Sequence, residues 1–433
     1  MSKEIFRKRR ADFMKKMKGG AALFLSAPQY VRNNDVQHPY RQESDFHYLS
    51  GFSEPDSAFL LLPEEKKERF VMFVLPRDPE QEMWTGKRTG VEGALESFGA
   101  DAAHPIDKLR EMLPKYLTHR EKLFFSLGRH PDFDGFLIKT INQLKWKGRK
   151  GIFGPWEITD PAVILWDMRL VKDGDEIKNL RRACDIAVEA QIAAMKNARA
   201  GMMEYEIQAM IESVFIRNGS RRAGFESIVA SGNNATVLHY IENGKRISGR
   251  DLVLADIGCE YGFMTSDITR VFPAGRKFSP AQKAVYEIVL QVNKSIIEKA
   301  SGGAMYQDLQ SAAVKMLSQG MLDLKLLKGN LETIIETVEY KKFFPHRIGH
   351  YLGTDVHDVG AYFEKGLSVK LRKGSVLTVE PGLYVQKSSE NVPDRFRGIG
   401  VRIEDDIIIT DGRPEVLTSG APKEIEDIED IRK

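Results

Sequence analysis

Acidic residues at the ends of apolar, strand-like runs are the feature that most restricts how this chain can fold. Asp256 follows LVLA, Glu380 follows VLTV and Glu404 follows VRI, and these runs are rich in the branched residues typical of buried strands. Burying a carboxylate without a partner is energetically costly. The sheet therefore needs positive charge close to these acids, and several acids buried together need a cation.

Further residues of the C-terminal half belong to the same pattern. Asp267 lies in TSDITR, His239 in TVLHY, His346 and His350 in HRIGHYLG, and His357 in VHDVG. Taken singly, an aspartate at a strand end is usually a turn residue, and a lone histidine is usually a hydrogen-bonded structural residue. Their joint occurrence near strand ends of one domain favours a metal site instead. One imidazole with several carboxylates suits Mn²⁺, while Fe²⁺, Co²⁺ and Zn²⁺ remain alternatives.

The chain is long enough to form two domains, because 433 residues exceed the usual size of a single hydrophobic core. Strand-like and helical stretches alternate between Ala21 and Leu170, which predicts an α/β domain over residues 1–170. A stretch rich in Gly, Pro and Asp follows, and Asp173 can cap a helix that begins near Glu176. Residues 171–433 then combine helices with short valine- and isoleucine-rich strands, VRIEDDIIIT among them, and predict an α+β domain.

Composition and charge exclude several classes of protein. The net charge is +3 and charged residues make up 29% of the chain, without the basic excess of a nucleic-acid-binding protein. No apolar run is long enough to span a membrane, so we expect a cytoplasmic protein.

Cys184 and Cys259 lack the spacing of a thiolate zinc site and predict buried free thiols. The first 17 residues predict a surface helix that packs Phe13 and Met17 inward, and residues 421–433 predict a solvated end.

Four segments together resemble a known family. ADIGCEYGFMTSDITR, HRIGHYLGTDVHDVG, TVEPGLY and GIGVRIEDDIIIT follow one another in the order found in the pita-bread metallopeptidases, which share the creatinase/aminopeptidase fold. PYRQESDFHYLSGF, at Pro39 to Phe52, is similar to the first domain of the aminopeptidase P branch, also called Xaa-Pro aminopeptidases. The resemblance implies an α/β N-terminal domain followed by an α+β pita-bread catalytic domain.

The resemblance also implies which residues bind metal. Asp256 matches the ligand of one metal ion only, and Asp267 and Glu404 match carboxylates that bridge two ions. His350 and Glu380 match the ligands of the other ion. The implied cofactor is a pair of divalent ions, with Mn²⁺ as the expected metal.

Other positions match residues that act around the metals. His239 and His357 match histidines that contact the substrate, and His346 matches a histidine at the edge of the pocket. Arg402 resembles an arginine that supports the carboxylates, and its alternate position to Glu404 on one strand predicts that both share a face. Glu380 is the candidate general base.

Three further side chains have open interpretations. Arg347 stands where relatives often have glycine between the two histidines, and it either narrows the pocket or, as we expect, points to solvent. Tyr351 and Trp84 are aromatic candidates for the pocket wall, although aromatic residues at such positions are more often part of a core.

The implied activity is hydrolysis of the first peptide bond of peptides that have proline at the second position. The resemblance further implies a homo-oligomer, a dimer or a tetramer. From the charge and the apolar runs we expect no nucleic-acid or membrane partner. A prolidase, which cleaves only Xaa-Pro dipeptides, shares the metal site and is the first alternative. A peptide-binding member that has lost catalysis, or a metal-free hydrolase such as creatinase, is disfavoured because all five ligand positions are occupied by suitable residues.

Overall fold

The computed structural model describes residues 2–433, which form two compact units that meet in sequence between Met168 and Arg169. Each unit buries apolar cores of its own. No helix within residues 2–433 is both long enough and apolar enough to cross a membrane.

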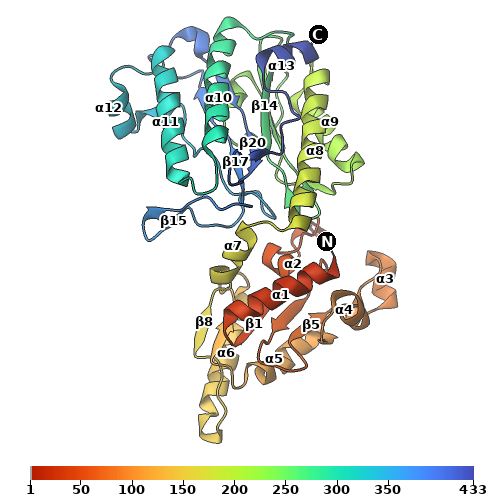
Figure 1. Cartoon of the computed structure of the whole chain (residues 1–433). Coiled ribbons are helices and arrows are strands. Elements are labelled where there is room, and N and C mark those ends of the chain that lie inside the picture. Colours follow the sequence, from red (N-terminus) through yellow and green to blue (C-terminus); the bar gives the residue numbers. More distant parts are fainter. Residues whose placement is uncertain (1) are drawn as a thin grey trace. The chain divides into compact units, whose positions relative to one another are not determined.

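A six-stranded mixed sheet forms the centre of the first unit (Figure 1). Its strands, in spatial order, are β6 (Ala102–Pro105), β5 (Phe70–Val74), β4 (Ala58–Leu61), β1 (Ala21–Leu25), β7 (Lys122–Phe124) and β8 (Glu157–Thr159). Strand β1 is antiparallel to β4 and parallel to β7. Ala22 and Phe24 of β1 enter one apolar cluster, and Ala21 and Leu23 enter another, so the sheet is buried on both faces.

Helices cover both faces of this sheet, which confirms the predicted α/β fold. One cluster includes residues of α1 (Lys3–Met17), α2 (Ser44–Ser50), α4 (Gly90–Phe98) and α7 (Ala162–Leu170), and the other includes residues of α5 (Leu109–Leu117) and α6 (Pro131–Trp146). The remaining elements of the unit are the strands β2 (Val31–Asn33) and β3 (Val36–Gln37) and the helix α3 (Pro79–Thr85).

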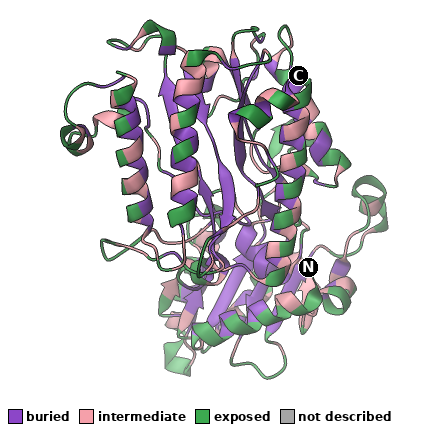
Figure 2. Cartoon of the chain, turned by 45° about the horizontal axis from the view of Figure 1, so that its top comes forward, coloured by how far each residue is buried: buried purple, intermediate pink, exposed green. Residues whose placement is uncertain are grey.

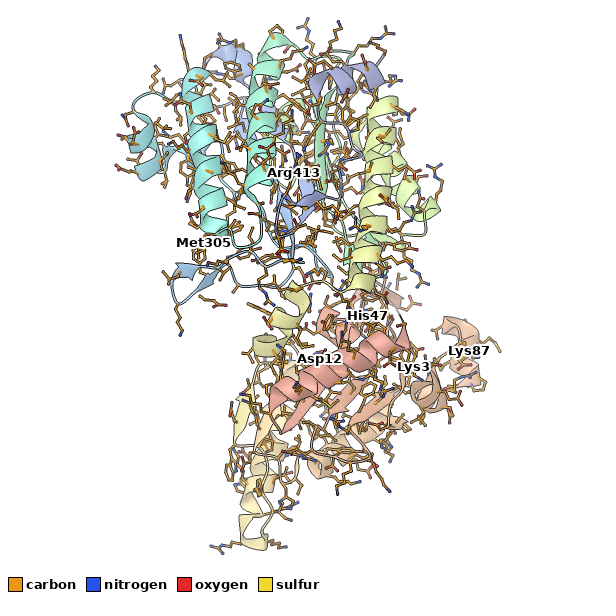
Figure 3. The ribbon with its side chains drawn as sticks, viewed as in Figure 1. Lys3, Asp12, His47, Lys87, Met305 and Arg413 are labelled. Atoms are coloured by element: carbon orange, nitrogen blue, oxygen red, sulfur yellow. The ribbon has the colours of Figure 1, made fainter. Side chains whose placement is uncertain are left out.

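Helix α1 is the surface helix predicted at the start of the chain. Its Phe13 and Met17 are buried, whereas charged residues such as Lys3 and Asp12 lie on its exposed side (Figure 3). Arg10 is also buried, because its guanidinium donates to a carbonyl at the end of α2, at 2.9 Å. A basic residue thus joins the core by satisfying a backbone acceptor.

Short antiparallel strands and long helices build the second unit, as an α+β fold predicts. One sheet contains β10 (Ile228–Ser231), β11 (Leu252–Ile257) and β14 (Ile268–Pro273), and another contains β17 (Val376–Val379), β20 (Asp405–Ile408) and β21 (Glu415–Val416). Strands β18 (Gly382–Val385) and β19 (Ile399–Arg402) form a pair. In Figures 1 and 2, helices α8 (Gly174–Asn197), α10 (Pro280–Lys299) and α11 (Tyr306–Asp323) lie in front of buried strands.

The other elements of the unit are shorter. They are α9 (Glu204–Arg217), α12 (Leu331–Glu336), α13 (Ile425–Ile431), β9 (Arg222–Ala223), β12 (Cys259–Tyr261), β13 (Met264–Thr265), β15 (Phe363–Glu364) and β16 (Leu367–Ser368). Helix α8 begins as predicted, because Asp173 accepts from the backbone N–H of Glu176 in a capping box. Cys184 and Cys259 are buried and free, as predicted.

Two predictions for the C-terminal part of the chain are wrong. VRIEDDIIIT is two strands rather than one: β19 ends at Arg402, β20 begins at Asp405, and the two strands pair with different neighbours. Residues 421–433 are not a solvated end, because Ile428 on α13 is fully buried. Arg432 is also buried and donates to the carbonyl of Ala274 at 2.8 Å, so the end of the chain is packed against the rest of the second unit.

Candidate metal centre

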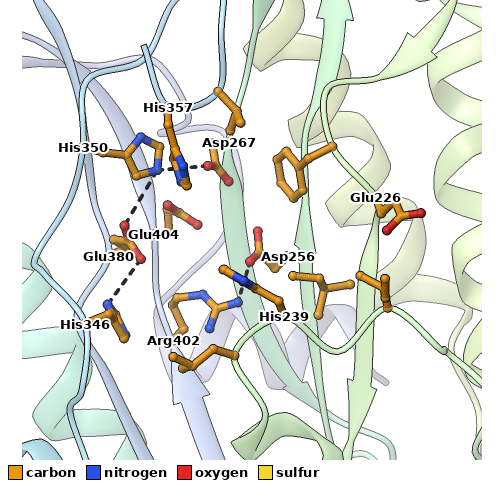
Figure 4. Close-up of a pocket in the computed structure, with 15 residues that line it drawn as sticks. Glu226, His239, Asp256, Asp267, His346, His350, His357, Glu380, Arg402 and Glu404 are labelled. Carbon is orange, nitrogen blue, oxygen red and sulfur yellow. Dashed lines mark hydrogen bonds and ion pairs between the residues drawn. The ribbon is translucent and has the colours of Figure 1, made fainter. Parts of the chain in front are cut away.

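All the predicted site residues lie around one cavity of about 490 Å³ in the second unit (Figure 4). The cavity is lined by Phe225, Glu226, Ile228, Leu238, His239, Ile241, Asp256, Asp267, His346, His350, Val356, His357, Glu380, Arg402 and Glu404. We call Asp256, Asp267, Glu380 and Glu404 the cavity acids. They come from segments as much as 148 residues apart in sequence, the separation between Asp256 and Glu404.

Two groups of antiparallel strands position the cavity acids. Asp256 lies on β11 opposite Thr269 of β14, and Asp267 immediately precedes β14. Glu380 follows β17, and Glu404 lies in the break between β19 and β20. The backbone N–H of Glu404 donates to the carbonyl of Thr269 at 3.1 Å, which joins the two groups of strands directly at the site.

Two buried side-chain amides hold the backbone beside the cavity acids. Gln191 on α8 and Asn293 on α10 are both fully buried, and each amide nitrogen donates to two carbonyls at 2.8–3.2 Å. Every one of these carbonyls belongs to a residue next to a cavity acid in sequence: Ala255, Ile268, Val379 and Ile403. The long helices therefore fix the strand ends from which the acids project.

The donor atoms are close enough together to bind a divalent metal ion. Asp267, His350 and Glu404 each offer one ligand atom, and these three atoms lie within 4.8 Å of one another. The Nε2 atom of His350 is 3.4 Å from Oδ2 of Asp267 and 3.8 Å from Oε1 of Glu380. Within residues 2–433, Oδ1 of Asp256 is buried without a hydrogen-bond partner. Several carboxylates with one imidazole and an orphan oxygen fit a divalent ion of the Mn²⁺ or Zn²⁺ type.

The electrostatics of the cavity also favour a bound cation. Burial, reinforced by repulsion between neighbouring carboxylates, raises the pKa of Asp267 and Glu380 well above their usual range and that of Glu404 to about 8. Burial lowers the pKa of His346 and His350 to about 4, so both imidazoles are neutral near pH 7. Neutral imidazole is the form that binds metal, and a cation would remove the repulsion between the acids.

Arg402 is the only basic side chain on the cavity wall of the described chain, and it supports one cavity acid. Its Nη2 donates to Oδ2 of Asp256, and its Nε donates to the hydroxyl of Thr269 at 3.0 Å. That hydroxyl in turn donates to Oε2 of Glu404 at 2.7 Å. Arg402 and Glu404 both face the cavity, although the strand ends between them.

The histidines lie at different places around the cavity acids (Figure 4). The rings of His357 and His350 are in edge-to-face contact, with centroids 4.4 Å apart. The Nδ1 atom of His346 is 3.5 Å from Oε2 of Glu380. His239 and His357 are exposed on the cavity wall, where a peptide can reach them.

Tyr384 is a residue that the sequence analysis missed. Its hydroxyl accepts from Nη1 of Arg402 at 2.9 Å and lies 2.8 Å from Nε2 of His346. It therefore links the two predicted side chains behind the cavity. The signal was present, since Tyr384 belongs to the TVEPGLY segment that also contains Glu380, but nothing in that segment indicates which way the ring points.

The residues with open interpretations do not line the cavity. Arg347 is exposed, and its guanidinium carbon lies 5.7 Å from the ring centroid of Phe363. Tyr351 is 1% exposed and stacks on Tyr362, so it is a core residue. Trp84, in the first unit, is 81% exposed.

Comparison with known proteins identifies the family. The model of metallopeptidase family M24 matches residues 178–411, and that of the aminopeptidase P N-terminal domain matches residues 6–125. The chain is 39% identical to the Xaa-Pro aminopeptidase of Haemophilus influenzae over 432 residues, which cover 100% of this chain and 97% of that protein.

Solved structures agree with the sequence matches. The aminopeptidase PepP of Pseudomonas aeruginosa is 41% identical, with a TM-score of 0.97 over 100% of this chain and 98% of that one. A zinc-substituted aminopeptidase P of Escherichia coli in complex with product is 37% identical, with a TM-score of 0.96 over the same shares. By sequence and by structure, this chain belongs to metallopeptidase family M24, with the N-terminal domain of the aminopeptidases P.

Proposed function

We infer that this chain is a metal-dependent aminopeptidase that releases the first residue of peptides with proline at the second position. The observation that carries this conclusion is the convergence of four cavity acids and His350 around one cavity in a member of family M24. The prolidase alternative is disfavoured, because a relative named Xaa-Pro aminopeptidase matches over 97% of its length.

We propose that the cavity holds two divalent ions, most favourably Mn²⁺. Asp267 and Glu404 would bridge the ions, Asp256 would bind one of them, and His350 and Glu380 would bind the other. The short distances between the donor atoms of Asp267, His350 and Glu404 support this assignment. When bound, such ions polarise a carbonyl and lower the pKa of water from about 15.7 towards 7.

The protein's own groups would then bind the substrate and move protons. Glu380 accepts the proton released when water adds to the scissile carbonyl, and it passes this proton to the leaving nitrogen. His239 and His357 contact the substrate and stabilise the charge that develops on the carbonyl oxygen. Arg402 and Tyr384 keep Asp256 and His346 in place, which pre-organises the site before substrate arrives.

Proline at the second position has a physical consequence for the reaction. The nitrogen of an Xaa-Pro bond carries no hydrogen, so an enzyme cannot hold it through an N–H group. The site must instead hold the substrate by its carbonyl and its free N-terminus, and must protonate a tertiary nitrogen. Glu380, which would take the proton from water beside His350, is placed to deliver it.

The assembly and location of the protein remain predictions. We propose a homo-oligomer, either a dimer or a tetramer, in the cytoplasm. Light scattering on the purified protein tests the first prediction, and fractionation of cells that produce it tests the second.

Hydrolysis of Arg-Pro-Pro beside the dipeptide Arg-Pro tests the proposed reaction directly. The protein is loaded with Mn²⁺, and an EDTA-treated sample that is reloaded afterwards serves as the control. We expect cleavage of the tripeptide, little cleavage of the dipeptide, loss of activity with EDTA and recovery on reloading. Preferential cleavage of the dipeptide would identify a prolidase, and activity that persists in the metal-free sample would refute the metal-dependent mechanism.

A further inference from the structure

One wall of the cavity contains a charged side chain that the proposed reaction does not use. Apart from the cavity acids, the histidines and Arg402, the lining consists of five apolar side chains and one further carboxylate, that of Glu226 (Figure 4). The apolar lining residues are Phe225, Ile228, Leu238, Ile241 and Val356. An apolar surface that contains one acid is not suited to metal binding, but it can contact a substrate side chain.

The strand register places Glu226 a short distance from the metal centre. Ile228 on β10 pairs directly with Asp256 on β11, and Glu226 precedes Ile228 by two residues. Phe225, Glu226 and Ile228 line the cavity, whereas Ser227 and Val229 are almost completely buried.

The carboxylate of Glu226 is available to a ligand. Its side chain is exposed, and within residues 2–433 no hydrogen bond or ion pair involves it. The cavity acids, in contrast, lie in a buried cluster next to His350 and Arg402. A free carboxylate at the end of an apolar wall matches a lysine or arginine side chain, which has an apolar stem and a charged end.

The position of the substrate N-terminus determines which residue meets this wall. An aminopeptidase must hold the free N-terminus of its substrate next to the metal centre, and Ile228 pairs directly with Asp256 of the proposed centre. An amino group held next to Asp256 places the first residue of the peptide beside Ile228. The side chain of that residue then extends along the wall towards Glu226, and its length decides whether it reaches the carboxylate.

We propose that Glu226 determines specificity for the first residue of the substrate and favours peptides that begin with lysine or arginine. This inference rests on the proposed aminopeptidase reaction and extends it to the side chain that is released. The apolar residues of the wall hold the stem of the lysine or arginine, and Glu226 pairs with its cationic end.

Two peptides that differ only in charge test the proposal. Lys-Pro-Pro is compared with norleucine-Pro-Pro, whose first side chain has a similar length without the ammonium. We expect Glu226→Gln to lower the ratio of their kcat/KM values by about two- to fivefold at low ionic strength, as expected for an exposed ion pair. Glu226→Lys should lower this ratio further and increase the relative cleavage of Glu-Pro-Pro.

Glu242→Gln is the matched control, because Glu242 is exposed and adjoins Ile241 but does not line the cavity. It removes the same charge and should leave the ratio unchanged. Provided that norleucine-Pro-Pro is still cleaved, two outcomes would overturn the proposal. One is an equal effect of the two substitutions on the ratio of kcat/KM values, and the other is no effect of Glu226→Gln on it. Failure of the unaltered, Mn²⁺-loaded protein to cleave either peptide would instead refute the proposed reaction, and the inference with it.

Discussion

Glu404 and Asp405 are neighbours in the chain and are both buried, yet their carboxylates have opposite surroundings. Glu404 faces the other cavity acids, and its pKa is raised to about 8. Asp405 points away from the cavity, accepts from Arg270 at 2.7 Å and from Lys423 at 2.6 Å, and its pKa is lowered despite its burial. Asp405 is neutralised by two cationic side chains, whereas within residues 2–433 Glu404 forms no ion pair with lysine or arginine and shares the cavity with the other acids.

The same arrangement recurs at His357 and Asp358. His357 is exposed on the cavity wall, whereas Asp358 is buried and pairs with Arg169 at 2.6 Å and Lys172 at 2.7 Å. Lysine and arginine lower the pKa of Asp358, as they do for Asp405. We call Asp405 and Asp358 the paired acids. In both places a side chain that lines the cavity is followed in sequence by a buried acid. The ion pairs of that acid hold the backbone on the side away from the cavity.

A bridging ligand and a paired acid should therefore respond differently to substitution. Asp267→Asn removes a proposed bridging ligand, so we expect loss of bound metal and a fall in kcat of more than about a thousandfold, which exceeds the cost of losing a single oxyanion donor. The metal-free variant should nevertheless be at least as stable as the metal-free parent, because one repulsive acid is gone. Elemental analysis, kinetics and urea unfolding measure the three quantities. Normal metal content with full turnover would refute the bridging role of Asp267.

The opposite result is expected at a paired acid. Asp405→Asn leaves the buried Arg270 without its counter-charge, so we expect a loss of about 3–5 kcal/mol in the free energy of unfolding. Asp411→Asn is the matched control, because its pair with Lys373 is exposed and should contribute less than about 1 kcal/mol. Urea unfolding of the metal-free proteins compares the two. Equal, small losses would show that the Asp405 ion pairs do not stabilise the fold.

Substitution of His357, which we propose contacts the substrate, should separate catalysis from metal binding. His357→Ala removes a ring that contacts His350 but is not one of the proposed ligands, so we expect both ions to remain. Turnover should fall by roughly a hundredfold, the cost of a lost transition-state contact. Metal analysis and kcat on the same sample measure both effects. Extensive loss of metal would instead place His357 among the ligands.

The cavity acids could be predicted from local sequence, but their supporting partners could not. Asp256 and Glu380 stand out because each ends an apolar run. Arg270 and Asp405 are 135 residues apart, and their pairing depends on the packing of strands that the local pattern does not determine. The strand break at Glu404 escaped prediction for the same reason, since VRIEDDIIIT looks continuous until its halves pair with different strands.

Misjudged exposure explains the remaining errors. The C-terminal segment contains many charged residues and therefore looks solvated, yet Lys423 pairs with Asp405 and also donates to Oδ1 of Asn293 at 2.7 Å. Asn293 in turn holds the carbonyls beside Glu380 and Glu404. The end of the chain thus belongs to the support of the metal centre, although nothing in its own sequence indicates this.

The cavity acids should also affect how the free energy of unfolding depends on pH. Glu404 keeps its proton in the folded, metal-free protein up to about pH 8, whereas the unfolded chain loses it near pH 4.3. The folded protein therefore binds more protons in this window, and its stability falls as the pH rises. Below about pH 6.5, His346 and His350 act in the opposite direction, because their pKa values are lowered to about 4.

The clearest window is therefore pH 6.5 to 8, where we expect Glu404 alone to lower the stability of the metal-free protein by about 1–2 kcal/mol, with Asp267 and Glu380 acting in the same direction. Saturating Mn²⁺ should abolish this loss, because the ions displace protons from the acids and bind only the folded state. The paired acids make no contribution in this window, since Asp405 and Asp358 are ionised throughout it in both states. Urea unfolding at pH 6.5 and 8, with and without Mn²⁺, measures the difference. Stability that rises with pH in the metal-free protein would show that the cavity acids are already neutralised by the protein, as Asp405 is.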